Sequence, residues 1–274
     1  MGLNHNTPLE KYNVKGTDVW VKRDDLHNGD LDLPPWAKIE GVRRLLTWKE
    51  LIDRNKPVIH LTVRGSYTGW VLGYYGKELD YQIKIAYGNS KNYPMESLEK
   101  MKSYGVDLVP IKPNMMKIVY NSMKKMADEK GWQRLPYAFD HPVYHDYWRE
   151  KSYLVFRDKE LSKFDNLVIC AGSGVTCIGV IQSFLDVHNF PMEKKVYIVS
   201  TSTISTVANK LKRWETYFPN NVMINTTPYE FYNEMDFYET PFPCNPNWDK
   251  KAWWWLEENI DKLNGKTIFW NIGA

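Results

Sequence analysis

A glycine-rich heptapeptide, Cys-Ala-Gly-Ser-Gly-Val-Thr at residues 170–176, has the composition of an anion-binding turn. It joins the apolar run at 166–169, a predicted buried strand, to the apolar run at 177–185, a predicted helix. Gly172 and Gly174 remove side chains where the backbone must turn sharply. Backbone N–H groups at such a helix N-terminus attract anions, above all phosphate. For this stretch alone, a tight turn without a ligand is the alternative.

The elements that must position this turn alternate between strand and helix. Strands are predicted at 18–23, 57–63, 81–88, 106–111, 166–172, 195–201 and 266–271, and helices at 37–54, 64–79 after a short loop, 94–105, around 115–130, 175–188 and 249–263. The alternation predicts an α/β fold with mainly parallel sheets, in which ligands bind at the carboxyl ends of the strands. The turn lacks the Lys-Ser/Thr of a P-loop and the full spacing of a dinucleotide fingerprint.

Composition narrows the function classes. A net charge of +3 is too mild to indicate a nucleic-acid-binding protein by itself. No apolar run reaches about 18 residues, so no membrane span is expected. The N-terminus lacks a secretory signal, and the three cysteines do not make a disulfide framework, which favours a cytoplasmic location. Pro142 is expected to break a regular helical pairing of His141 with His145, and no third ligand has diagnostic spacing, so no metal is predicted. Twelve Trp and eighteen Tyr hint at a flat or aromatic ligand.

Several stretches occur in an order that resembles the pyridoxal-phosphate (PLP) enzymes of the tryptophan-synthase-β type, fold type II. They are TPLE at 7–10, VKRDDL at 21–26, the lysine of AKIEGVRRLL at 37–46, RGSYTG at 64–69, the glycine turn, NPNWDKKA at 245–252 and FWNIGA at 269–274. The chain is most similar to the D-cysteine desulfhydrase and aminocyclopropanecarboxylate deaminase group, as a shortened, phage-type member. The resemblance implies two Rossmann-like three-layer αβα domains. Residues 1–50 and 151–274 would form the large cofactor-binding domain, and residues 51–150 the small one.

The resemblance also implies a cofactor, pyridoxal 5'-phosphate, and residues that hold it. Lys38 stands where the family has its Schiff-base lysine, and the rigid turn LPPWA before it fixes its direction. The alternative for Lys38 is a solvated lysine in the first turn of a helix. Asn271 would lie under the cofactor. The glycine turn resembles the family's phosphate cup, which here would consist of Gly172, Ser173, Gly174, Val175 and Thr176.

Two further motifs resemble parts of the family's catalytic and substrate sites. Asp249 falls where the deaminase group has a Glu against the pyridine nitrogen, although an acid there can also be a simple helix-start charge. Trp248 replaces a tyrosine that is catalytic in the cyclopropane deaminases, and an indole cannot offer a phenolate. The loop that usually carries an Asn lacks it. The substrate-binding residues that the resemblance implies are Gly65, Ser66, Tyr67 and Thr68 of this loop, for which a plain loop role is the alternative, together with Trp248.

These expectations lead to one main function and two alternatives. The main one is a PLP enzyme that forms a Schiff base with a small amino-acid-like substrate and performs carbanion chemistry at Cα, as a lyase, deaminase or decarboxylase, with Lys38 and Asp249 as catalytic residues. The first alternative is a phage DNA-hypermodification enzyme that acts on an amino acid attached to a thymine base, with modified DNA as partner. The second is a non-catalytic binding protein that keeps the fold. The resemblance also implies a homodimer, because members of the family commonly form dimers.

Overall fold

The computed structural model describes residues 2–89, 94–112, 115–157, 164–186, 193–216, 220–229 and 233–274. The chain divides into two compact units. The larger consists of Met1–Leu31, Pro35–Lys38 and His145–Ala274, and the smaller of Asp32–Pro34 and Ile39–Tyr144. The domain division at residues 50 and 150 stays a prediction. The compact units differ from it, because the helix after Lys38 belongs to the smaller unit and residues 145–150 belong to the larger.

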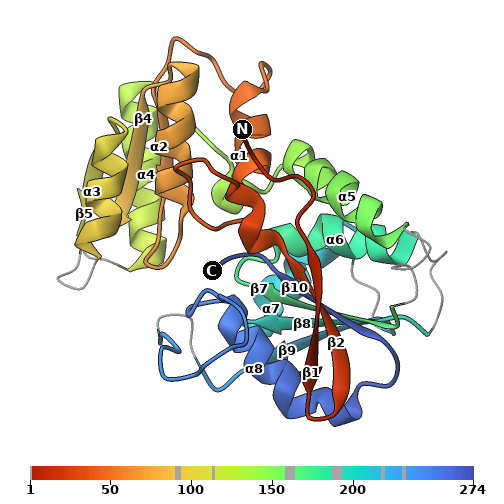
Figure 1. Cartoon of the computed structure of the whole chain (residues 1–274). Helices are drawn as coiled ribbons and strands as arrows, with labels where there is room; N and C mark the ends of the chain where they lie inside the picture. Colours follow the sequence, from red (N-terminus) through yellow and green to blue (C-terminus); the bar gives the residue numbers. More distant parts are fainter. Residues whose placement is uncertain are drawn as a thin grey trace. The chain divides into compact units, whose positions relative to one another are not determined.

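The larger unit is built on a six-stranded sheet with the order β1-β2-β10-β7-β8-β9. Only β1 and β2 pair antiparallel, and the other neighbours are parallel. In Figure 1, α5 and α6 lie over one face of this sheet and α8 over the opposite face. The elements are β1 (Leu9–Val14), β2 (Thr17–Arg23), η1 (Asp24–Asn28), α5 (Pro142–Phe156), β7 (Asn166–Ala171), α6 (Val175–Asp186), β8 (Lys195–Ser200), α7 (Ile204–Arg213), β9 (Val222–Thr226), α8 (Asp249–Asn259), η3 (Ile260–Lys262) and β10 (Thr267–Asn271).

The central strands of this sheet are apolar because helices cover both faces. Every residue of β7 and β10 is buried, as expected for a parallel sheet with two covered faces. Beneath the sheet, Trp253 of α8 packs edge-on against Phe269 of β10, with ring centroids 5.2 Å apart. The core therefore lies directly behind the strand ends that carry the glycine turn and the C-terminal residues.

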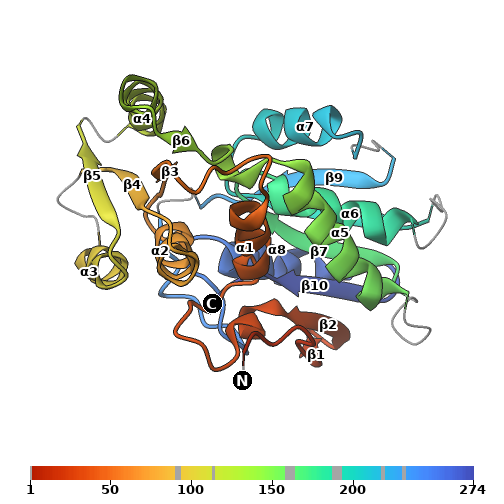
Figure 2. The same ribbon diagram turned by 90° about the horizontal axis from the view of Figure 1, so that it is seen from above.

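The smaller unit holds a parallel four-stranded sheet with the order β5-β4-β3-β6. In Figure 2, α2 and α3 lie on one face of this sheet and α4 lies on the other. The elements are α1 (Ile39–Thr47), β3 (Val58–Leu61), α2 (Thr68–Leu79), β4 (Ile83–Gly88), α3 (Met95–Ser103), β5 (Asp107–Ile111), α4 (Met116–Lys130), β6 (Gln133–Arg134) and η2 (Tyr137–Phe139).

Glycines let α2 approach its neighbours closely. A Cβ at Gly69 would lie 2.1 Å from the Met101 side chain, and one at Gly76 would lie 2.2 Å from the side chain of Ile83. The two glycines are seven residues apart, so they share one helix face. That face packs against α3 and β4.

The predicted fold class is confirmed, with differences in single elements. The predicted helix over 37–54 ends at Thr47, where the Thr47 hydroxyl donates to the carbonyls of Arg43 and Arg44 and competes with the backbone pattern. The sequence interpretation missed β1, α5, α7 and β9, and Pro142, taken there as a helix breaker, begins α5. Among the described residues, no helix has the length and apolar character that a membrane span requires.

Candidate active site

The glycine turn adopts the predicted conformation. β7 ends at Ala171, and α6 begins at Val175. Gly174 has φ +81, the left-handed region that favours glycine. The first N–H groups of α6 have no partners within the helix. They lie at the carboxyl end of a central parallel strand, where such folds bind ligands.

Trp248 covers this turn. A Cβ at Gly172 would lie 2.6 Å from the Trp248 ring, so only glycine fits beneath the indole. Trp248 immediately precedes α8 and is half-buried. The contact brings together two stretches that the sequence separates by more than seventy residues, the turn and the 245–252 motif.

The C-terminal residues hold Lys38 next to the end of β10. The N–H of Ala37 donates to the carbonyl of Ile272 at 2.8 Å. Trp36 forms an isolated bridge with Gly273, and a Cβ at Gly273 would lie 3.3 Å from the Trp36 ring. Lys38 is thus tied to the strand edge that the parallel strands share, and its side chain is half-buried.

The same peptide segment holds Asp249. The N–H of Ile272 donates to Asp249 Oδ1 at 3.0 Å, while the Ile272 carbonyl holds the residue before Lys38. Asp249 is buried, and burial raises its pKa to about 7, although the nearby Lys38 amine opposes that rise. Burial lowers the pKa of Lys38, and the attraction of Asp249 opposes that fall. Within the described ranges, no cation forms an ion pair with Asp249.

Two cysteines lie around the same groups, and the sequence interpretation gave them no place there. Cys170 and Cys177 are buried, and the Cys177 thiol donates to the Cys170 carbonyl at 3.5 Å. Burial raises the pKa of Cys177 to about 12 and raises the pKa of Cys170 well above its usual value, so both thiols stay neutral. Both interact electrostatically with Lys38 and Asp249. The sequence does contain a sign of this arrangement, because the two cysteines are seven residues apart, one at the end of a predicted strand and the other in the predicted helix that follows.

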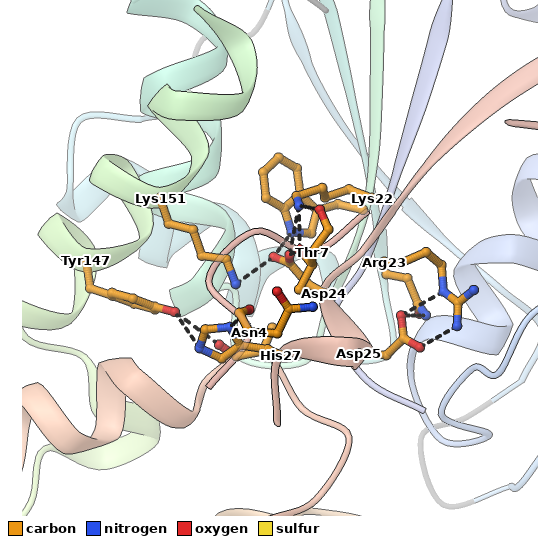
Figure 3. A network of polar contacts seen from close by, with 12 residues as sticks. Asn4, Thr7, Lys22, Arg23, Asp24, Asp25, His27, Tyr147 and Lys151 are labelled. Atoms are coloured by element: carbon orange, nitrogen blue, oxygen red, sulfur yellow. Dashed lines mark hydrogen bonds and ion pairs between the residues drawn. The ribbon is translucent and has the colours of Figure 1, made fainter. Parts of the chain in front are cut away.

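Asn271 faces a buried network built from the VKRDD motif. Its Nδ2 donates to Asp25 Oδ1 and to the Pro243 carbonyl, each at 2.9 Å, so both of its amide hydrogens are used within the chain. Asp25 also accepts two hydrogen bonds from Arg23, at 2.9 and 2.7 Å (Figure 3). The structure therefore places Asn271 as a link between this network and Ile272. Its predicted cofactor contact stays a prediction.

Asp24 is the centre of a second cluster, also shown in Figure 3. Its carboxylate lies 3.1 Å from Lys151 Nζ and 3.5 Å from Lys22 Nζ, and it accepts from Trp270 Nε1 at 2.8 Å. Burial alone would raise the pKa of Asp24, but Lys151 and Lys22 outweigh it and hold that pKa at about 2. The hydroxyl of Thr7, in the TPLE motif, also donates to this carboxylate. These motifs therefore tie the N-terminal segment to β2, β10 and α5.

The predicted substrate segment lies in the smaller unit, at the start of α2. Gly65 has φ +72. The hydroxyls of Ser66 and Thr68 are 2.8 Å apart, and Ser66 Oγ accepts from the Thr68 N–H at 3.3 Å. The Tyr67 ring lies edge-on to Trp70, with centroids 6.2 Å apart. The segment is an ordered turn into a helix, and its substrate role stays a prediction.

Metal-binding chemistry has no support in the part of the chain that the structure describes. No group of three or more His, Cys, Asp or Glu residues there is placed to hold a metal ion. His145 is buried and packs against Trp214, with ring centroids 4.3 Å apart.

Comparison with known proteins places this geometry in context. No protein-family model matches the chain. The glycyl-dTMP PLP-dependent decarboxylase of Pseudomonas phage M6 is 26% identical over 284 residues, which cover 98% of this chain and 99% of that protein.

Solved structures agree with the fold. A homologue of ACC deaminase matches with a TM-score of 0.77 at 18% identity, over 100% of this chain and 90% of that chain. The cysteine synthase of Entamoeba histolytica matches with a TM-score of 0.73 at 17% identity, over 98% and 85% of the two chains. These are fold type II PLP enzymes, so the predicted resemblance is confirmed.

Proposed function

We propose that this chain, which has the fold of the fold type II PLP enzymes, decarboxylates an amino acid carried on a thymine nucleotide. The proposal depends on one observation. A single peptide segment at Ile272 holds both Lys38 and Asp249 at the strand edge where the glycine turn lies. The phage M6 decarboxylase, similar over nearly the whole length of both chains, supports the reaction and the substrate class.

The residues present fit pyridoxal phosphate. Lys38 supplies an amine whose pKa is lowered by burial. Asp249 is a buried carboxyl at the first position of α8, with no ion-pair partner among the described residues, and a protonated pyridine nitrogen would supply that partner. The N–H groups at the start of α6 suit a phosphate. Lys38, Asp249 and residues 172–176 would therefore hold the cofactor.

The chain's own residues then account for the reaction. When bound, the cofactor supplies an electron sink for the charge that is left at Cα after the carboxylate departs as CO2. Lys38 Nζ delivers a proton to Cα to complete the product. With the cofactor bound, Asp249 would supply the negative charge that favours the protonated form of its ring nitrogen.

Trp248 favours decarboxylation over the alternatives. Its indole cannot act as a base, so the site lacks a second proton acceptor at this position. Loss of CO2 breaks the Cα–carboxyl bond without first removing a proton from Cα, and a single proton donor is enough to finish the reaction. The indole also packs directly over Gly172 in the turn.

The test is a direct assay of the PLP-loaded protein with glycyl-dTMP and, in parallel, with free amino acids. The proposal predicts CO2 release and a product lighter by one CO2 from glycyl-dTMP, with no reaction in the Lys38→Ala variant. Release of ammonia from free amino acids would instead support deaminase chemistry. A protein that binds PLP and transforms none of these substrates would contradict the proposal.

A further inference from the structure

The charge of the chain is divided unevenly between its two compact units. The smaller unit contains seventeen Lys and Arg and twelve Asp and Glu, a net charge of +5, while the larger contains nineteen and twenty-one, a net charge of −2. The modest overall charge of +3 therefore conceals a basic unit. A positive unit attracts polyanions even when the whole chain is near neutral.

The outer side of α4 concentrates this charge. Lys117, Tyr120 and Lys124 are spaced i, i+3 and i+7, so they share one helix face. Val119 and Met123 are buried in the core between α4 and the sheet, and the Tyr120 ring packs partly against that core. Lys117 and Lys124 are exposed, and Lys124 Nζ lies 5.8 Å from the centre of the Tyr120 ring.

The acids of α4 do not neutralise these two lysines. Asp128 pairs with Arg134 at 3.2 Å, and Glu129 pairs with Lys125 at 3.8 Å. Among the residues that the structure describes, Lys117 and Lys124 have no acidic partner. Lys117 also lies in the first turn of α4, which contains no acid, although the helix dipole favours an acid there. The sequence thus keeps a cation where helix stability would select the opposite charge.

An exposed aromatic ring adjoins these lysines. Tyr137 is 43% exposed, and its ring lies edge-on to Tyr120, with centroids 5.0 Å apart. The next two residues, Ala138 and Phe139, have φ values of 54 and 64, which are unfavourable for L-amino acids. Phe139 is buried and stacks on His60 at 4.7 Å, so the strained turn fixes Phe139 inward while Tyr137 stays at the surface.

We propose that Lys117, Tyr120, Lys124 and Tyr137, the basic face of α4, bind a single-stranded segment of the DNA that carries the modified base. The lysines would contact phosphates, and Tyr137 would stack on an unpaired base, the combination that single-strand binding uses. The inference rests on the proposed function, because it supplies the reason for a DNA partner. It adds a site outside the residues that hold the cofactor.

The binding test uses the PLP-loaded full chain and a fluorescently labelled single-stranded oligothymidylate, followed by anisotropy over a range of salt concentrations. Each lost phosphate contact on a single strand reduces the slope of log K against log salt by about 0.7, so Lys117→Gln/Lys124→Gln should lower it by about 1.4. Tyr137→Ala should weaken binding about fivefold or more, and Tyr137→Phe should retain most of it.

A matched control removes the same charge elsewhere on the smaller unit. Lys77→Gln/Lys102→Gln changes two exposed lysines, on α2 and α3. If DNA binds to the basic face of α4, the slope of log K against log salt should change less in this control than in Lys117→Gln/Lys124→Gln. Equal slopes in the two variants, or tighter binding of duplex than of single strands with no effect of Tyr137→Ala, would overturn the inference.

Activity separates failure of this surface from failure of the proposed function. On free glycyl-dTMP, Lys117→Gln/Lys124→Gln should match the unaltered protein, and on an oligonucleotide that carries the same group its KM should rise while kcat holds. If both substrates are processed equally well by both proteins, the docking surface is wrong and the function stands. If neither substrate is processed, the function fails, and the salt slopes alone decide on the surface.

Discussion

Replacing Gly172 with alanine would test the packing that joins the glycine turn to the start of α8. The new methyl group would lie 2.6 Å from one ring atom of Trp248 and 3.2 Å from two others. Distances this short force the ring to move, and overpacking of this kind typically costs about 1–3 kcal/mol of stability. Gly172 does not have a positive φ, so the collision with Trp248 is the whole of the expected cost.

A double-mutant cycle isolates that collision. In a Trp248→Ala background the ring is absent, so Gly172→Ala should then cost close to nothing, giving a coupling energy of about 1–3 kcal/mol. Gly174→Ala is the contrasting control. Its φ of +81 is unfavourable for alanine whatever surrounds it, so its cost of about 1–2 kcal/mol should persist in both backgrounds.

The assay is urea unfolding followed by circular dichroism, because fluorescence would change with the loss of a tryptophan. PLP uptake by the same variants gives a second reading, since a displaced indole changes the turn that would hold the phosphate. An undiminished cost of Gly172→Ala in the Trp248→Ala background would refute the contact between the turn and the indole.

Three further predictions concern buried charges. Because the pKa of Asp249 is raised to about 7, the cofactor-free protein should lose stability as pH rises from about 4 to 7, on the order of 4 kcal/mol in total, and Asp249→Asn should abolish that slope in urea unfolding. The pKa of Asp24 is held at about 2, so its ion pairs stabilise the fold above about pH 4 and fail as pH falls toward 2. Lys151→Met should therefore cost about 1–3 kcal/mol at neutral pH, with the difference shrinking in acid, and a pH-independent difference would contradict this. Asp25→Asn removes the negative charge that pairs with Arg23 and one of the two oxygens that accept from it, with an expected cost of about 3–5 kcal/mol in the same assay, whereas a neutral outcome would show that the network does not support the C-terminal segment.

The sequence predicted the parallel strands and the glycine turn because their signals are local. β7 is a continuous apolar run, and the turn after it needs glycine at position 174 whatever else the chain does. The amphipathic pattern of α7 rests on only two buried residues, Val207 and Leu211, too few to stand out in a polar sequence. α5 was missed because Pro142 was taken as a break, although proline is favoured at the first position of a helix.

The site was predicted in part. A family resemblance suggested Lys38 and Asp249, and the structure shows why they lie near each other, through hydrogen bonds to the backbone of Ile272. Any residue other than proline at position 272 could form these hydrogen bonds, because they use the backbone N–H and carbonyl groups. The residue types in the sequence therefore give no sign of this link. Sequence reasoning also could not place Cys170 and Cys177 near Lys38, because their proximity depends on how β7, the glycine turn and α6 are arranged in space.

The most direct measurement is the site of covalent attachment of pyridoxal phosphate. The protein is mixed with the cofactor, reduced with borohydride and digested, and the modified peptide is identified by mass spectrometry. The account predicts one adduct, on Lys38, which disappears in Lys38→Ala while the visible absorption of the loaded protein is lost with it. An adduct on another lysine, or none in a folded protein that has been offered excess cofactor, would contradict it.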